Sequence, residues 1–295
     1  MNLSKPLCLL LCATLGACSK PEAPAAAPVP VPAPAAPAKP APSADQRVEA
    51  LLMRAVFGKA YRAASADALT QLAEPEQPGK RGNYVVNPVA HTILPNGETV
   101  LVANAQSAGA DGDAESGHPV PGLLNVFFLK QTAAQWQVLK RQENIATLGA
   151  SGQIGQAVWT RLGADLPALA MRHGDTAMGS SIEFLSLFDL GADTMRDLTE
   201  SISIHSDNDG ACQPDTDKCW NISGAWHFAP SAAGARYDDL LIDFSGESGE
   251  AKPHAELKEG DKVVRIVSKI HASARYAFDG KSYQLVEGEN VVPGF

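Results

Sequence analysis

The fold is decided by residues 274–285, Ala-Arg-Tyr-Ala-Phe-Asp-Gly-Lys-Ser-Tyr-Gln-Leu, in which two alternating apolar and polar runs flank Asp279-Gly280. Alternation with a period of two is the pattern of a half-buried strand. An Asp-Gly pair between two such runs predicts a type I′ turn, because both central residues of that turn need a positive φ. The stretch therefore predicts an antiparallel hairpin.

The same pattern recurs along most of the chain. Asn96-Gly97 lies between apolar runs at 92–94 and 99–102, and a polar turn separates 123–130 from 136–140. Further short apolar runs occupy 158–162, 168–172, 182–190, 202–205, 226–228, 240–244 and 263–267. About a dozen short strands joined by Gly, Asp and Asn turns predict antiparallel hairpins or a meander, packed as a sandwich or an open barrel.

The predicted β-rich domain begins with a helix at about 44–62. Ser43 is a helix-capping residue, and apolar side chains recur at helical spacing from Val48 to Ala60. A second helical piece is expected over 65–72. The predicted fold is mainly β (α+β), in a single domain over 44–295 that is long enough to bury a sizeable core.

The first residues have the features of an export signal. Lys5 precedes an apolar run at 7–13 that is too short to span a bilayer. Leu15-Gly16-Ala17-Cys18 follows and resembles the lipobox of bacterial lipoproteins, a resemblance that covers residues 1–19. It implies that a signal peptide of residues 1–17 is removed and that Cys18 is lipidated, with two or more acyl chains as the membrane anchor. The alternative is an ordinary secretory peptide cut nearby.

Residues 18–43 are predicted to be the anchor and its tether. Nine prolines occur in 21–43, where no core can form, so the segment should be a polyproline II spacer that rises ~3.1 Å per residue. The resemblance implies a location in the bacterial cell envelope. Ser19 after the lipidated cysteine favours the outer membrane, with the domain facing the periplasm.

Charge and cysteine content limit the partners and the redox state. Loss of Lys5 with the leader leaves 23 basic side chains against 33 acidic ones, so nucleic acid and anionic lipid are not expected partners. Cys212 and Cys219 are the two cysteines left in the folded body. In an oxidising compartment an even pair predicts a disulfide, which would close a short loop.

Glycines at 149, 152 and 155, followed by Asp175, resemble the Gly-x-x-Gly-x-x-Gly phosphate turn of short-chain dehydrogenases and reductases. The resemblance would imply a nicotinamide cofactor at a helix N-terminus. In that family, however, the motif lies near the start of the fold, and this chain has no Tyr-x-x-x-Lys. We therefore expect a Gly-rich loop between two hairpins and no NAD(P).

An acidic loop at 205–219 is the one candidate metal site. It contains four aspartates whose oxygens suit calcium, namely Asp207, Asp209, Asp215 and Asp217. His205 stands where the first Asp of a calcium loop belongs, and an acidic turn held by a disulfide needs no ion. Ca²⁺ is thus a hypothesis for this loop, and no other cofactor is expected.

The sequence identifies no catalytic residue. The seven histidines are scattered, without a His-Glu-x-x-His motif, and no Gly-x-Ser-x-Gly motif is present. The leading hypothesis is a non-enzymatic envelope lipoprotein that binds a protein, a glycan or a small ligand. A periplasmic hydrolase using His173 or His205 is one alternative, and it predicts that histidines and carboxylates gather in one cleft. A structural envelope-maintenance lipoprotein is the other.

Overall fold

One α-helix and fourteen β-strands make up the described part of this computed structural model. The structure describes residues 42–75, 77–115, 117–133, 135–213, 218–231, 234–251 and 265–294. The described residues belong to one compact unit. The strands account for 59% of the described residues and helices for 7%, which confirms the mainly β prediction.

The helix α1 (Ala44–Phe57) begins with the predicted cap. The Ser43 hydroxyl accepts a hydrogen bond from the Gln46 N–H (3.1 Å), and the Gln46 side chain accepts one from the Ser43 N–H (2.9 Å). Gly58 then starts a 3-10 turn, η1 (Gly58–Ala60), so the helix ends earlier than predicted. The second helical piece, predicted over 65–72, is wrong. A strand forms there because tertiary pairing overrides local helix propensity.

Six strands form the first sheet, in the order in which they occur in the chain. They are β1 (Tyr61–Arg62), β2 (Asp67–Glu74), β3 (Gln77–Ile93), β4 (Thr99–Ser107), β5 (Gly122–Gln131) and β6 (Trp136–Leu148). All neighbours are antiparallel. The predicted hairpin at Asn96-Gly97 is confirmed, since the Leu94 N–H donates to the Glu98 carbonyl (2.7 Å) across the turn.

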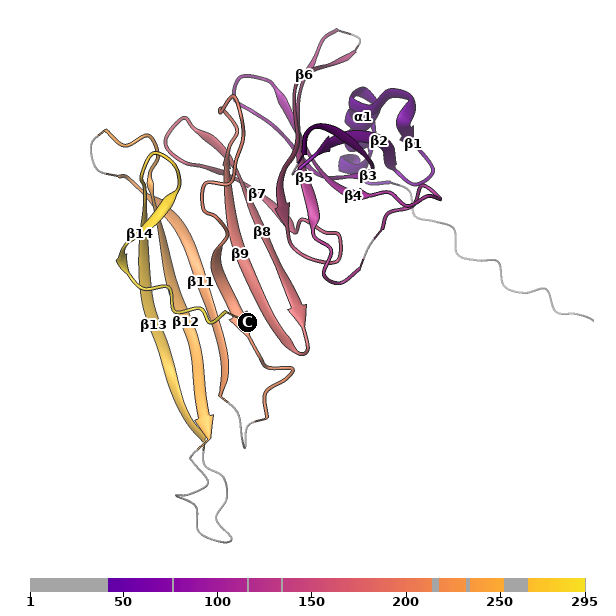
Figure 1. The fold of residues 1–295 in the computed structure, drawn as a ribbon. Helices are drawn as coiled ribbons and strands as arrows, with labels where there is room; N and C mark the ends of the chain where they lie inside the picture. Colours follow the sequence, from indigo (N-terminus) through magenta and orange to yellow (C-terminus); the bar gives the residue numbers. More distant parts are fainter. Residues whose placement is uncertain are drawn as a thin grey trace, which may run out of the picture. The chain divides into compact units, whose positions relative to one another are not determined.

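Eight strands form the second sheet, again as an antiparallel meander (Figure 1). They are β7 (Gln156–Arg161), β8 (Pro167–Ala177), β9 (Ser180–Asp189), β10 (Ile202–Asp207), β11 (Cys219–Ala229), β12 (Asp239–Ala251), β13 (Arg265–Phe278) and β14 (Tyr283–Gly288). Neither sheet closes on itself, and the two pack as a sandwich.

The hairpin of 274–285 is confirmed, but its turn differs from the predicted type. The Asp279 N–H donates to the Ser282 carbonyl (3.0 Å), so Gly280 and Lys281 are the central residues. Gly280 has a positive φ of 100° but Asp279 does not, so Asp279-Gly280 does not form the predicted type I′ turn, which needs a positive φ at both residues. The Asp279 carboxylate accepts the N–H groups of Lys281 (2.7 Å) and Ser282 (2.8 Å), which holds this residue at the first turn position.

The core consists of three apolar clusters that lie in successive layers. In the first, α1 packs on one face of the six-stranded sheet, with Phe57 edge-on to Phe127. In the second, the opposite face of that sheet, which includes Phe128, meets Phe188 of β9. Strands β4 and β5 are therefore buried on both faces, which explains their nearly continuous apolar runs.

The third cluster lies within the eight-stranded sheet. Leu185 and Leu187 of β9 contact apolar side chains of β12 that include Ile242. In β11, β12 and β13, the residues that alternate with these buried apolar ones point to the opposite face of the sheet, which is polar and exposed. This face carries the rows Asn221-Glu247-Lys269 and Ser223-Ser245-His271.

Candidate functional site

Two clefts adjoin across strands β8 to β11. The first encloses about 440 Å³, and its lining includes three histidines, two carboxylates and one guanidinium: His118, His173, His205, Asp175, Glu183 and Arg172. The second encloses about 550 Å³, shares Arg172, Glu183 and His205 with the first, and continues to Ser223 and Trp226. Both volumes lie in the range of small-molecule sites. We call the two clefts together the β8–β11 groove.

The strand register assembles the middle of this groove. Glu183 of β9 pairs with His205 of β10, which pairs with Ser223 of β11, so the three side chains form one row. A bulge between Ser203 and His205 sets this alignment. The His205 ring approaches the Ser223 hydroxyl through Nδ1 (2.9 Å) and the Asp207 carboxylate through Nε2 (3.1 Å). Arg172 donates to Glu183 (2.7 Å) at the junction of the two clefts.

His173 lies beneath the groove, buried and fully hydrogen bonded. Its Nδ1 accepts the Gly149 N–H (3.3 Å), so Nε2 carries the proton and donates to the Ser186 hydroxyl (2.9 Å). Ser186 in turn donates to the Asp197 carboxylate (2.6 Å). Burial lowers the pKa of His173, although Asp197 and Glu183 oppose the shift. The His173 ring is therefore a neutral structural group. The Ser186 hydroxyl donates its proton to Asp197 and not to His173, so His173 does not activate Ser186 as a nucleophile.

This geometry predicts an acid-sensitive fold. The folded state resists protonation of His173, whereas the unfolded chain takes up the proton near the ordinary histidine pKa, so the free energy of unfolding should fall as the pH drops below about 6.5. Urea unfolding at about pH 7.5 and about pH 5.5 measures the loss. His173→Gln should lose less stability over this interval than the exposed control His227→Gln. Equal losses in both variants would contradict the assignment.

His118 and Asp175 form a pair at the rim of the groove. Nε2 of His118 lies 3.2 Å from the Asp175 carboxylate, and the two side chains are 53% and 34% exposed. The Thr176 N–H also donates to this carboxylate (2.7 Å), and the Thr176 hydroxyl donates to Ser181 (3.1 Å). The side chains of His118, Asp175 and Thr176 are thus accessible to solvent, whereas His173 is buried.

The glycine motif at 149–155 is a connection between the two sheets. It leaves β6 and enters β7, a strand, so it does not form the strand–turn–helix unit that a dinucleotide fingerprint requires. Gly155 has a φ of 83°, and a Cβ there would lie 2.1 Å from the Arg172 carbonyl oxygen. Close backbone packing beside the groove therefore accounts for this glycine, and the sequence interpretation as a loop agrees with the structure.

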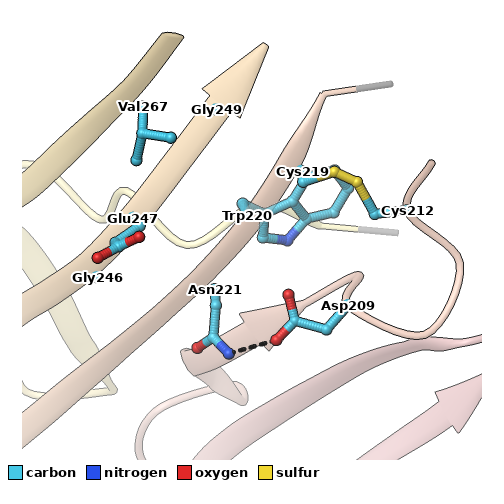
Figure 2. A pocket seen from close by; sticks show the side chains of 9 residues that line it. All are labelled: Asp209, Cys212, Cys219, Trp220, Asn221, Gly246, Glu247, Gly249 and Val267. Atoms are coloured by element: carbon cyan, nitrogen blue, oxygen red, sulfur yellow. Dashed lines mark hydrogen bonds between the residues drawn. A yellow bond between two sulfur atoms is a disulfide. The ribbon is translucent and has the colours of Figure 1, made fainter. Parts of the chain in front are cut away.

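The predicted disulfide between Cys212 and Cys219 is confirmed, with 5.5 Å between the two Cα atoms. It borders a third cleft, of about 540 Å³ (Figure 2). In this cleft the Asn221 amide donates to the Asp209 carboxylate (2.8 Å), and Glu247 is paired with Lys269 of the next strand. The disulfide thus fastens the acidic loop to β11.

The calcium hypothesis concerns the same loop. Asp207 accepts the Asp209 N–H (3.2 Å) and contacts His205, so both of these aspartates already have protein partners. Asp215 and Asp217 lie outside the described residues. Among the residues that are described, no group of three or more His, Cys, Asp or Glu side chains is placed to hold a metal ion. Calcium binding at this loop therefore stays a prediction.

The structure brings together residues that the sequence kept apart. His173 and His205, the two histidines considered as bases, line one cleft with Asp175, although His173 is buried. His118, Glu183 and Trp226 were missed as site residues. Strand alternation does not by itself group Glu183, His205 and Ser223 on one face. The grouping also needs the strand register, which the sequence does not give.

Comparison with protein-family models, with curated proteins and with solved structures finds no match to this chain. No helix in the described ranges is long and apolar enough to cross a membrane.

Proposed function

We propose that this protein is a membrane-anchored lipoprotein of the bacterial envelope whose domain binds a ligand in the β8–β11 groove. The observation that supports this most is the convergence of Arg172, Glu183 and His205 where two clefts join. These groups are held by one another and by neighbouring side chains, which pre-organises them for recognition. The existence of such a groove favours a binding role over a purely structural one.

The anchoring part of the proposal rests on Leu15-Gly16-Ala17-Cys18 and on the Pro-rich segment that follows. We expect the protein to incorporate a palmitate analogue during growth and to fractionate with membranes. Cys18→Ala should abolish labelling, because the thioether acceptor is lost, and should leave uncleaved or released protein. Label that persists in this variant would refute lipidation at Cys18.

The binding part is tested by photocrosslinking in living cells. A benzophenone side chain at Ser181, which lines the groove, should capture a ligand as a discrete adduct that changes the mass of the protein. The matched control is Ser273 on the exposed face of β13, where no described cleft lies. No adduct at Ser181, or identical adducts at both positions, would overturn the proposal.

A hydrolase is the second candidate, and one observation favours it. His118 and His205 share the groove with Asp175 and Glu183, which is the clustering that a hydrolase requires. The exposed His118–Asp175 pair would be the general base for an attacking water. If the protein is a hydrolase, the Asp175→Asn variant should capture more intact ligand than the parent protein in the crosslinking experiment. Equal amounts of intact ligand in the variant and the parent would argue for binding alone.

A further inference from the structure

We infer that a cleft apart from the β8–β11 groove binds a phosphate group, either as the free ion or on a small phosphomonoester. We call it the Asp189 cleft, and it encloses about 220 Å³. Its lining includes Asp189, Thr194, Arg196, Arg236, Tyr237 and Phe278. Among the described residues, it shares none of its lining with the groove, so the inference goes beyond the proposed function and does not depend on it.

A buried carboxylate, Asp189 at the end of β9, organises one wall of the cleft. Its side chain is only 2% exposed. Arg236 Nη2 and the Tyr237 hydroxyl both donate to its Oδ2 (2.8 Å each), and the Gly191 N–H donates to its Oδ1 (2.7 Å). Burial and, second, Asp189 raise the pKa of Tyr237 to about 12, so this hydroxyl keeps its proton. Both oxygens of Asp189 are thus satisfied within the protein, and the acid does not compete for the ligand.

The Arg236 guanidinium is held in place yet stays accessible. Besides its bond to Asp189, it lies over the Tyr237 ring, with 5.2 Å from Cζ to the ring centroid. That ring in turn packs edge-on against Phe278, with 4.5 Å between centroids. The Arg236 side chain is nevertheless 59% exposed, and a guanidinium has five N–H donors. A cation fixed in this way loses little conformational entropy when an anion binds to it.

A second guanidinium, that of Arg196 in the β9–β10 connection, makes the cleft positive. Arg196 is exposed, and within the described ranges no carboxylate forms an ion pair with it. Of the described residues that line the cleft, Asp189 is the one acid, so two guanidinium groups face one carboxylate. The β8–β11 groove has the opposite balance, with one guanidinium against two carboxylates. In a chain of net charge −9, this cleft is therefore where an anion meets attraction.

The donors and the size of the cleft favour phosphate. A guanidinium pairs with a carboxylate or a phosphate through two parallel hydrogen bonds. Here two guanidinium groups and the exposed Thr194 hydroxyl line one small space. The three terminal oxygens of a phosphate point in different directions and are all strong acceptors, so one ion can meet all three donor groups. The volume is below the ~300 Å³ at which sites for drug-sized ligands begin, which restricts the ligand to a small one.

The test is calorimetric titration of the full chain in nonionic detergent with inorganic phosphate and with glycerol 3-phosphate. Arg196→Gln should weaken the binding of phosphate at least about tenfold, because charge-assisted hydrogen bonds are lost. Arg161→Gln is the matched control, since it removes the same charge from another exposed arginine, which lines a different cleft. It should bind as the parent does. Thr194→Val should weaken binding about fivefold through the loss of one neutral hydrogen bond.

The two titrants identify the source of the phosphate group. Tighter binding of inorganic phosphate would assign the cleft to the free ion, and tighter binding of glycerol 3-phosphate would assign it to a phosphomonoester. Saturable binding of neither, or equal weakening in the Arg196→Gln and Arg161→Gln proteins, would overturn the inference. Acetate that binds as tightly as phosphate would overturn the phosphate assignment. Both arginines are exposed, so equal urea midpoints in the two variants should verify that each is folded.

Discussion

Gly155→Ala should destabilise the domain by about 2–6 kcal/mol, which is a large share of the stability of a typical domain. Two costs add. A non-glycine residue at the φ of 83° is strained by about 1–3 kcal/mol. A Cβ only 2.1 Å from the Arg172 carbonyl oxygen must also move the backbone of β8, and overpacking of this kind costs about 1–3 kcal/mol. Urea unfolding at neutral pH measures the change.

Gly97→Ala is the matched control for that substitution. Its φ of 79° is nearly the same, but a Cβ there would meet nothing within 4 Å. It should therefore show the strain alone, about 1–3 kcal/mol. The difference between the two variants isolates the close contact. Similar losses in both would show that the chain tolerates a Cβ at position 155, and the structural account of the glycine motif would then fail.

Phe188→Ala should cost about 3–5 kcal/mol, because the deletion of a fully buried ring removes apolar contacts and leaves a cavity. Phe188 belongs to β9 and lies in the cluster that includes Val126 and Phe128 of the other sheet. The cavity would therefore open between the sheets. Urea unfolding should shift to lower concentration as a single transition, whether it is followed by tryptophan fluorescence or by far-ultraviolet circular dichroism.

Two controls define that result. Phe188→Leu keeps most of the volume and should cost clearly less than the alanine variant. Val286→Ala removes an exposed side chain of β14 and should change stability by about 0.5 kcal/mol or less. Two separate transitions in the Phe188→Ala protein would mean that the sheets unfold independently, which contradicts a shared core.

Much of the fold could be predicted from local pattern, and the errors have a common cause. The hairpins at Asn96-Gly97 and 274–285 were found because their turns need particular residues at particular φ values. Residues 65–72 were misjudged because a short segment with Ala and Leu fits both periods, and pairing with β3 decides it. The turn at Asp279-Gly280 is not the predicted type I′, because Asp279 lacks a positive φ and its carboxylate accepts the backbone N–H groups of Lys281 and Ser282.

The candidate site was predicted less well than the fold. Asp207 and Asp209 were singled out as neighbours in the sequence, and the structure pairs them with His205 and Asn221. Glu183 and Ser223 are separated from His205 by 22 and 18 residues yet lie beside it in register. No local pattern reports such a row, since it depends on which strands pair.

The sequence by itself determined the mainly antiparallel β architecture, the capped helix that starts it, and the disulfide between Cys212 and Cys219, because each follows from residues close together in the chain. It also carries the lipobox-like Cys18 on which the anchor proposal depends. Only the tertiary structure decided which side chains share a groove. The pairing of β8 to β11, with one bulge in β10, brings Arg172, Glu183 and His205 together. The reason is physical: a register shift of one residue would send each side chain to the opposite face.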